Sequence, residues 1–232
     1  MLLALPIRQV LPATPRARVV RLDLDGHAFD YTAGQAVMIG AHGSETKKAY
    51  SIASAPEDTS RYGFFELLVG LNDDGAAGPH LALTNGALVD VEGPLGSFTF
   101  PVDPPERNFV FVAGGTGIAP LRAMMRHAIL GPQPTRHIGL LYSARTPDDF
   151  AFADEFQVLA SSGIIDFRQT ITRDAQKWSG ARGRIDRVAL SELVHDPETL
   201  CFVCGPAAMV DEMPKLLGEI GVPRERIRIE EW

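Results

Sequence analysis

The stretch FVFVAGGTGIAPLRAMM, Phe109 to Met125, decides how the second half of the chain folds. An apolar run leads into a turn with Gly114, Gly115 and Gly117, and a helix-forming segment follows. Glycine lets a backbone approach a phosphate closely, and the amino end of a helix attracts negative charge. The pattern predicts a buried strand, a phosphate-binding turn and a helix. A tight turn without a ligand is the alternative for this stretch taken alone.

A second stretch, LCFVCGPAAMVDEM from Leu200 to Met213, repeats the order of strand, glycine turn and helix. It contains the fourth strand of this half. In a doubly wound sheet ordered 3-2-1-4-5, the first and fourth strands are neighbours where nucleotides bind. We therefore expect Gly205 and Pro206 to face the first glycine turn across one crevice. Cys201 and Cys204 stand three apart on a strand, so they should point to opposite faces and not chelate a metal together.

The two halves of the chain have different patterns. Residues 103–232 alternate strand runs with helical segments, which predicts a five-stranded parallel sheet with helices on both faces. Thr146 and Pro147 are typical of a helix start there. Residues 1–102 contain about six short strands separated by glycine and asparagine turns, which predicts a small antiparallel Greek-key barrel. The proline-rich segment PVDPPERN, residues 101–108, is the predicted linker.

Composition excludes several classes of protein. The net charge of −7 over 232 residues argues against a general nucleic-acid binder. No apolar run is long enough to span a bilayer, so no membrane contact is predicted. Two cysteines are too few for a four-cysteine iron–sulfur site within these residues, and such sparse usage favours a reducing compartment, the cytoplasm. The histidines show no ligand spacing, so no metal is predicted.

The stretch TKKAYSIASAP, Thr46 to Pro56, combines two lysines, an aromatic ring and small hydroxyls on a strand-like segment. An ordinary exposed strand end is one interpretation. The other is a surface for a flat, anionic ligand, with lysine for phosphate and Tyr50 for a ring face.

Several motifs, taken in order, resemble those of the ferredoxin–NADP reductase-like flavoproteins, and the resemblance covers nearly the whole chain. The flavin-side matches are YTAGQAVMI (31–39), KAYSIAS (48–54) and EGPLGSF (92–98). The nucleotide-side matches are GGTGIAP (114–120) and CGPAAMV (204–210), with WSGARGRI (178–185) and the ending IRIEEW (227–232). The resemblance implies an FAD-binding barrel (1–102) followed by an NAD(P)-binding α/β domain (103–232). It also implies hydride transfer from nicotinamide C4 to flavin N5.

The resemblance assigns roles to individual residues. It implies Ser51, Cys204 and Glu230 as catalytic residues. Tyr50 would lie on one flavin face, with Trp232 on the other. The full flavin set is Lys48, Ala49, Tyr50, Ser51, Ile52, Gly78, Gly93, Gly96, Ser97, Thr116 and Trp232. The NAD(P) set is Gly114, Gly115, Thr116, Gly117, Arg145, Thr172, Arg173, Arg184, Cys204, Gly205 and Pro206.

Cations after the second and third strands bear on the choice of nicotinamide. NADPH carries a 2′-phosphate, whereas NADH sites more often place a carboxylate against the ribose. Arg145, Thr172, Arg173 and Arg184 stand where the adenosine should lie, so NADPH is preferred over NADH. Solvated surface is the alternative interpretation of these arginines.

The flavin-phosphate segment departs from the family pattern at three positions. Lys48 replaces an arginine, and Gly70 stands where relatives often have a basic residue. The third is Gly78, in place of a serine. Lys47 is expected to compensate. His80, in the same segment, either touches the cofactor or is a solvated loop residue.

Three functions compete. The leading one is an NAD(P)H-dependent FAD reductase that feeds a separate acceptor, a 2Fe–2S ferredoxin or an oxygenase component. The second is a reductase of free flavin. The third is a non-catalytic electron-transfer subunit. Two groups of arginines offer a docking surface for an acidic ferredoxin, with solvated surface as the default for each: Arg16, Arg18 and Arg21, or Arg122 and Arg126.

Overall fold

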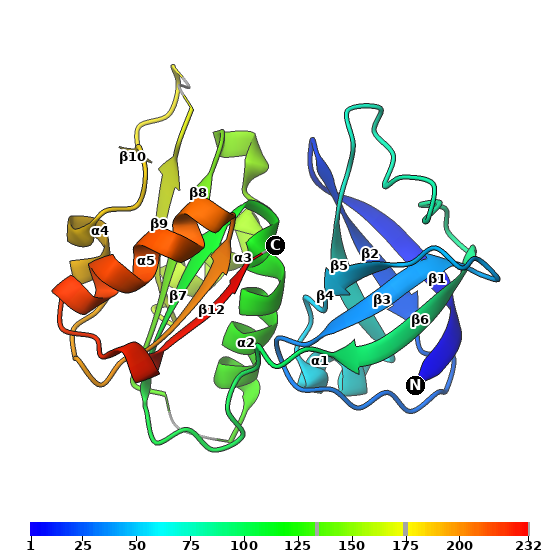
Figure 1. Ribbon diagram of the computed structural model, residues 1–232, viewed down its shortest axis with the longest axis horizontal. Coiled ribbons are helices and arrows are strands. Elements are labelled where there is room, and N and C mark those ends of the chain that lie inside the picture. Colours follow the sequence, from blue (N-terminus) through cyan, green and yellow to red (C-terminus); the bar gives the residue numbers. More distant parts are fainter. Residues whose placement is uncertain (133–134, 174–175, 232) are drawn as a thin grey trace. The chain divides into compact units, whose positions relative to one another are not determined.

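The computed structural model describes residues 1–132, 135–173 and 176–231. The chain divides into two compact units (Figure 1). Unit 1 contains residues 1–100 and 122–131, and unit 2 contains residues 101–121 and 132–232. The predicted domain boundary between residues 102 and 103 stays a prediction.

Unit 1 is the antiparallel barrel that the sequence predicts. Its six strands follow the order β4-β3-β6-β1-β2-β5. The two outer strands of this order, β4 and β5, meet through an isolated bridge between Ile52 and Leu67. The strands are β1 (Leu2–Thr14), β2 (Ala17–Asp23), β3 (Ala36–Ala41), β4 (Lys48–Ser51), β5 (Phe64–Gly70) and β6 (Leu88–Leu95), with one short helix, α1 (Pro56–Tyr62).

The core of the barrel forms because alternate strand residues point inward. Leu5, Ile39, Phe65 and Leu67 are fully buried in one continuous apolar cluster. Tyr50 packs against the edge of this cluster. The strand that carries the predicted flavin motif is therefore anchored to the barrel core.

Unit 2 is a parallel sheet in the order β10-β9-β8-β7-β11-β12. The strands β9, β8, β7, β11 and β12 reproduce the predicted order 3-2-1-4-5. The sixth strand, β10, has two residues and lies beside β9. The strands are β7 (Asn108–Gly114), β8 (His137–Ala144), β9 (Asp166–Ile171), β10 (Ala181–Arg182), β11 (Leu200–Gly205) and β12 (Ile227–Glu231).

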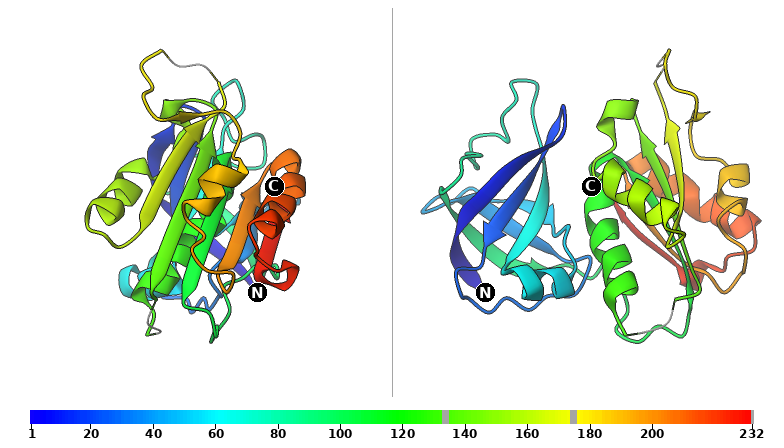
Figure 2. Two further views of the ribbon diagram at one scale, coloured as in Figure 1. Left: turned by 90° about the vertical axis from the view of Figure 1, so that its left-hand side faces the viewer. Right: turned by 180° about the vertical axis from the view of Figure 1, so that it is seen from behind.

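Helices cover both faces of this sheet, as predicted; Figure 2 shows α3 and α5 on opposite sides of it. On one face, aliphatic residues of the central strands pack against Leu190, Met213 and Leu217. The helical elements are η1 (Gly115–Gly117), α2 (Ile118–Leu130), η2 (Pro147–Asp149), α3 (Ala153–Ser161), α4 (Arg187–Ser191), α5 (Ala207–Glu219) and η3 (Arg224–Arg226). The second part of α2 belongs to unit 1.

The helix expected from Thr146 begins later. Thr146 forms a capping box with Asp149, but it caps only the short turn η2. The buried Phe150 then packs against Tyr142 with ring centroids 5.0 Å apart. Phe152 adopts a left-handed conformation with φ of 59°, and α3 starts at Ala153. The packing of Phe150 against Tyr142 therefore interrupts the helix that the sequence predicts from Thr146.

Candidate functional site

The predicted flavin strand β4 lies at one end of the barrel's strand order and pairs with β3. An edge strand directs half of its peptide groups away from its partner, where a ligand can bind them. Lys48 and Ala49 are exposed, Tyr50 and Ser51 are half-buried, and Ile52 is buried. The segment thus runs from solvent into the core within five residues, as a site for an extended amphipathic ligand requires.

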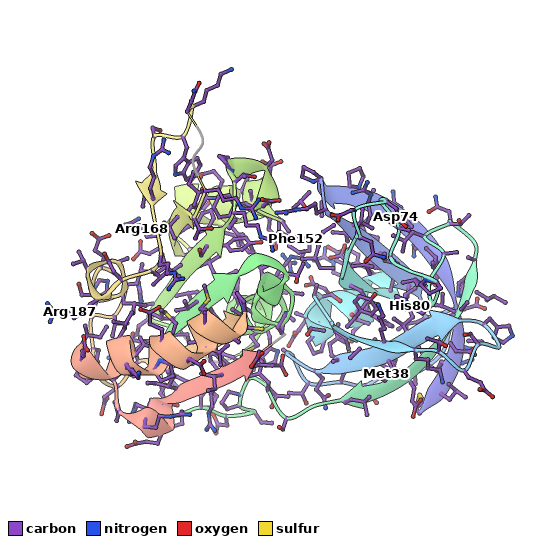
Figure 3. The ribbon with its side chains drawn as sticks, turned by 45° about the horizontal axis from the view of Figure 1, so that its top comes forward. Met38, Asp74, His80, Phe152, Arg168 and Arg187 are labelled. Carbon is purple, nitrogen blue, oxygen red and sulfur yellow. The ribbon has the colours of Figure 1, made fainter. Side chains whose placement is uncertain are left out.

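Tyr50 is held by His80, on the loop between β5 and β6 (Figure 3). Tyr50 Oη and His80 Nε2 lie 2.8 Å apart, and the two rings stack at 5.9 Å with an interplanar angle of 14°. Burial raises the pKa of Tyr50, so its phenol stays neutral and can donate to the imidazole. His80 therefore fixes the orientation of the ring that the sequence assigns to the flavin.

His80 is 1% exposed, so the solvated-loop interpretation of this residue is wrong. Burial, together with the nearby Lys48 ammonium, lowers the pKa of His80. Its Nδ1 is buried and has no hydrogen-bond partner within the described part of the chain. This atom lies 3.3 Å from the position of a Cβ added at Gly78. Gly78 has φ of 109°, which strains any other residue, and a side chain there would also crowd the imidazole; both account for the glycine.

Acid should destabilise the protein through His80. Its folded-state pKa lies below the ordinary value of 6.5, so the unfolded chain binds a proton more readily below that pH. The stability that neutral His80 contributes is therefore complete above pH 6.5 and is lost as the pH falls. We expect the Tm of a His80→Asn variant to fall less than that of the wild type between pH 7.5 and 5.5, as followed by thermal unfolding.

The exposed His27 provides the control, since His27→Asn should leave the pH dependence of the wild type unchanged. Equal pH dependence of the wild type and His80→Asn would contradict the assignment.

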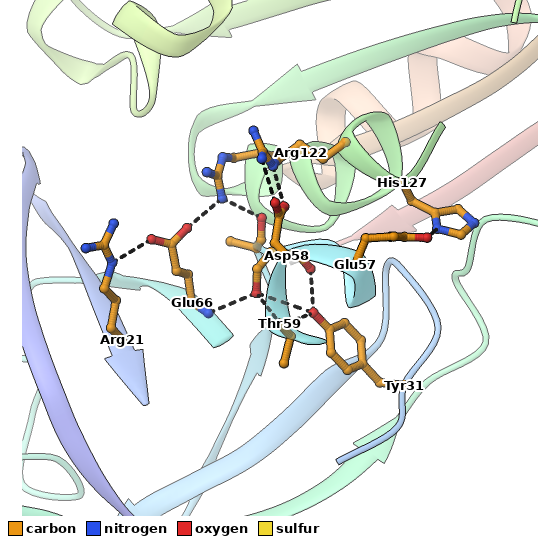
Figure 4. A network of polar contacts seen from close by, with 11 residues as sticks. Arg21, Tyr31, Glu57, Asp58, Thr59, Glu66, Arg122 and His127 are labelled. Atoms are coloured by element: carbon orange, nitrogen blue, oxygen red, sulfur yellow. Dashed lines mark hydrogen bonds and ion pairs between the residues drawn. The ribbon is translucent and has the colours of Figure 1, made fainter. Parts of the chain in front are cut away.

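A buried charge network binds the chain just after the predicted flavin strand (Figure 4). Arg122 donates to the Ala53 carbonyl at 2.7 Å and to Glu66 Oε2 at 2.8 Å, and Glu66 also accepts from Arg21 at 2.9 Å. Arg122 is 8% exposed and Glu66 6%. The network therefore fixes the chain two residues beyond Ser51.

The network overturns one docking surface. Arg122 is buried, and Arg126 donates to Asp58 at 2.7 Å, so neither is a solvated arginine available to a ferredoxin. Arg21 is likewise bound to Glu66, and Arg18 donates to two backbone carbonyls, those of Thr14 and Ala17.

The second predicted flavin segment lies at the end of β6. Gly93 is buried, and a Cβ there would lie 3.0 Å from a Val37 methyl. Gly96 has φ of 94° and open space around its Cβ position, and Ser97 beside it is exposed. The turn therefore leaves room for a ligand at Gly96, while Gly93 is required for packing. The Gly96 carbonyl accepts a bond from Gln35 Nε2 at 3.3 Å, which ties the turn to the loop before β3.

These features fit a bound FAD. The segment of β4 supplies a cation at Lys48, a neutral ring at Tyr50 and a hydroxyl at Ser51, and the turn after β6 adds an open glycine at Gly96. Lys47 is paired with Glu92 at 3.4 Å, so Lys48 remains the better phosphate ligand of the two. The ammonium group of a lysine binds phosphate with less directional hydrogen bonds than a guanidinium does.

In unit 2, the structure brings the two glycine turns together. A Cβ at Gly205 would lie 3.3 Å from Gly114 Cα, and a Cβ at Gly114 would lie 2.9 Å from Pro206 Cδ. Met209 of α5 also contacts both glycine positions. The adjacent strands β7 and β11 end here, as the predicted order requires. Gly114 and Gly205 are therefore needed for close packing, while Gly115, with φ of 56°, makes the turn itself.

Tyr142 supports this turn, and the sequence reasoning missed it. Its hydroxyl donates to the Gly115 carbonyl at 3.0 Å and accepts from the Ala151 backbone N–H at 3.2 Å. Burial raises the pKa of Tyr142 far above its ordinary value, so the phenol remains a donor. A tyrosine in the otherwise aliphatic run IGLLYSA was the available signal, since a buried hydroxyl needs a partner. Thr116 and Gly117 follow in η1, directly before α2.

Cys204 and Glu230 are neighbours across β11 and β12. Cys204 is 1% exposed, and burial together with the nearby Glu230 raises the pKa of its thiol well above the ordinary value. Burial also raises the pKa of the half-buried Glu230. Cys204 is therefore a neutral thiol and not a nucleophilic thiolate. Cys201 packs in the core cluster on the other side of the strand, and both cysteines are free.

The predicted adenosine-side residues gather at the carboxyl ends of β8, β9 and β10. The β8–β9 pairing continues past the strands, since the Thr172 N–H donates to Ala144 and the Arg173 N–H to Arg145, both at 2.9 Å. Arg145, Thr172, Arg173 and Arg184 are all exposed. Within the described residues, no carboxylate pairs with these three arginines. Trp232 lies outside the described residues.

Comparisons with known proteins identify a family domain in each half of the chain. The family described as "Oxidoreductase FAD-binding domain" matches residues 7–100, and "Oxidoreductase NAD-binding domain" matches residues 111–215. Ferredoxin–NADP reductase B of Sorangium cellulosum is 37% identical over 96% of this chain and 94% of its own length.

Two further proteins show the range of the relatives. NADH-cytochrome b5 reductase 1 of Meyerozyma guilliermondii is 26% identical over 83% of this chain and 69% of its own length. The crystal structure of a cytochrome P450 reductase from Amycolatopsis is 26% identical and covers 100% of this chain and 69% of its own, with a TM-score of 0.84.

The described residues contain no helix long and apolar enough to cross a membrane. The barrel and the doubly wound sheet, each matched by its own family model, occur together in this one chain. The chain therefore belongs to the ferredoxin–NADP reductase-like family of oxidoreductases, and it uses FAD as cofactor and a nicotinamide nucleotide as co-substrate.

Proposed function

We propose that this chain is an NADPH-preferring FAD reductase that passes electrons to a separate protein acceptor, a 2Fe–2S ferredoxin or an oxygenase component. Residues 1–102 would hold FAD and residues 103–232 the nucleotide. The observation that carries the proposal is the pair of glycine turns at Gly114 and Gly205, in the same chain as the Tyr50–Ser51 strand. The two free cysteines favour a reducing compartment, which we take to be the cytoplasm.

Bound FAD would supply the hydride acceptor, taking hydride at N5 from nicotinamide C4. The chain's own residues would orient the two reacting rings and keep solvent away from them. Tyr50, fixed by His80, would cover one face of the ring, and Ser51 would donate a hydrogen bond at the reactive edge. Cys204 would contribute a compact, uncharged thiol beside the nicotinamide. Glu230, with its raised pKa, would hold a proton to higher pH than a solvated glutamate.

The nucleotide preference rests on the exposed cations after β8, β9 and β10. A 2′-phosphate would gain charge-assisted hydrogen bonds from Arg145, Arg173 or Arg184. The name of the Sorangium relative specifies NADP, which supports this choice; the name of the Meyerozyma relative specifies NADH, which weighs against it.

Replacing Arg173 with alanine should therefore lower kcat/KM for NADPH by about tenfold, or about 1.4 kcal/mol, because one phosphate contact is lost. The value for NADH should change by less than about twofold. Steady-state reduction of ferricyanide with each nucleotide measures both. Arg168→Ala is the matched control: Arg168 is also an exposed arginine of this part of the sheet, but it lies within β9 (Figure 3). A wild-type enzyme that uses NADH as well as NADPH would overturn the preference.

The acceptor is proposed to be a separate protein because these residues contain only two cysteines, both buried on one strand. The test is a visible spectrum of the purified protein, followed by anaerobic NADPH and then an oxidised 2Fe–2S ferredoxin. Retained flavin that bleaches with NADPH and recolours with ferredoxin supports the proposal. A colourless protein that reduces added flavin with saturation would favour the free-flavin reductase, for which the missing serine at Gly78 is the specific observation. A flavin-loaded protein that never oxidises either nucleotide would make it a non-catalytic subunit.

A further inference from the structure

Three potential metal ligands meet at the amino end of the sheet in unit 2. His137 is the first residue of β8, Asp166 is the first residue of β9, and His195 lies on the loop between α4 and β11. One ligand atom from each lies within 4.8 Å of the other two. His137 Nε2 and Asp166 Oδ2 are 2.9 Å apart, and the two imidazole rings have centroids 4.9 Å apart.

The backbone under this cluster is firmly held. The Arg136 and His137 N–H groups both donate to the Arg107 carbonyl, which fixes the start of β8. The loop after His195 is organised by Asp196, whose side chain accepts from the Glu198 N–H at 2.8 Å and from Asn108 Nδ2 at 3.4 Å. Parallel pairing places Asp166 opposite Gly139, two residues from His137. The three side chains are thus presented by separate elements that the fold keeps together.

A histidine beside a carboxylate is not unusual in this chain. His42 Nδ1 lies 2.7 Å from Asp90, and His127 Nδ1 lies 2.8 Å from Glu57. Within the described residues, only the His137–Asp166 pair has a third ligand residue within reach. The second imidazole, from a distant part of the sequence, distinguishes this cluster from a simple ion pair.

We propose that His137, Asp166 and His195 form a binding site for a borderline divalent cation of the zinc class. Two imidazoles and one carboxylate are a ligand set that Zn²⁺ accepts, with water in the fourth position. Ligand atoms around a tetrahedral zinc ion lie about 3.4 Å apart, so closing from 4.8 Å requires small rotations of the side chains, two of which are exposed. Asp166 and His195 are both exposed, which gives the ion a path of entry.

The site is structural rather than catalytic because of its place on the sheet. The nucleotide residues follow the carboxyl ends of the strands, whereas this cluster lies at the amino ends. The eight residues of β8 separate the two by about 23 Å at ~3.3 Å per residue. A bound ion would cross-link β8, β9 and the loop before β11, and would stabilise the folded state by an amount that grows with the logarithm of the free ion concentration over Kd.

The test uses the full chain without a tag and loaded with FAD. The protein is freed of metals with a chelator and then dialysed. Titration with ZnCl₂ in a calorimeter should show one ion bound per chain with a Kd of the order of micromolar. At a hundredfold excess over Kd, the Tm should rise by roughly 5 °C. Turnover of NADPH should remain within twofold of the metal-free value.

Variants separate this site from adventitious binding. His195→Ala should weaken Zn²⁺ binding at least tenfold and abolish the rise in Tm, while its metal-free Tm stays close to that of the wild type because the side chain is exposed. Asp166→Asn should likewise weaken Zn²⁺ binding at least tenfold and abolish the rise in Tm, although both histidines remain. His42→Ala removes the matched two-ligand pair and should leave binding unchanged. Wild-type protein that binds no Zn²⁺, or His195→Ala that binds it as tightly as wild type, overturns the proposal.

Discussion

Replacing Arg122 with leucine should lower the free energy of unfolding by about 3 kcal/mol, at the lower end of the range for breaking a buried ion pair. Glu66 would keep only Arg21 as a partner, and the Ala53 carbonyl would lose its donor. Urea unfolding, followed by tryptophan fluorescence or circular dichroism, measures the loss. The effect is large because both members of the Arg122–Glu66 pair are less than 10% exposed.

Two further variants test the cause. Arg8→Gln breaks an exposed pair with Asp23 at 3.5 Å and should cost less than about 1 kcal/mol. The double variant Arg122→Leu/Glu66→Leu removes both buried charges and should recover part of the loss, because no unpaired carboxylate remains. Wild-type stability in Arg122→Leu would show that the network contributes nothing measurable.

Gly114→Ala should both destabilise the protein and impair its use of the nucleotide. The new Cβ would lie 2.9 Å from Pro206 Cδ and 3.0 Å from Met209 Cε, closer than packed atoms tolerate. Overpacking of this kind costs about 1 to 3 kcal/mol. Because the displaced residues form the second predicted nucleotide turn, KM for the nicotinamide nucleotide should rise roughly tenfold or more. Thermal unfolding and steady-state kinetics measure the two effects.

Gly218→Ala is the matched control in the same unit. Gly218 lies within α5, and its Cβ position has no atom within 4 Å. Alanine there should stabilise the helix by about 0.5 to 1 kcal/mol and leave KM unchanged. If Gly114→Ala behaved like Gly218→Ala, the close approach of the two turns would not matter for binding.

The sequence was sufficient for features that depend on local pattern. The parallel sheet, its strand order and the meeting of the two glycine turns follow from apolar runs punctuated by glycine, because few topologies satisfy such a pattern. The antiparallel barrel follows from short strands and frequent turns. The predicted flavin segment at Tyr50 and Ser51 lies on an edge strand, as its mixed polarity suggests.

Features that depend on residues far apart in the sequence could not be predicted from the sequence. Arg122 looks like a surface arginine in sequence, and only the fold brings Glu66 to it. His80 could not be assigned to the interior because the ring of Tyr50 that covers it lies thirty positions earlier. The strand β10 has two residues, too few to show any periodicity. The cluster of His137, Asp166 and His195 has no spacing signature, since its members come from three separate elements.

The closure of the barrel has a consequence for its motions. Between β2 and β5 the backbone forms a ladder of seven residue pairs, whereas the residue that follows β4 joins β5 through the isolated Ile52–Leu67 bridge. The Ala53 N–H donates to the Glu66 carbonyl just beyond this bridge, and Arg122 binds Ala53 and Glu66 together. Local opening favours places where backbone pairing is sparse. β4 itself is paired with β3 over four residues, so opening is expected on its β5 side, where the contacts of Arg122 to Ala53 and Glu66 supplement the sparse backbone pairing.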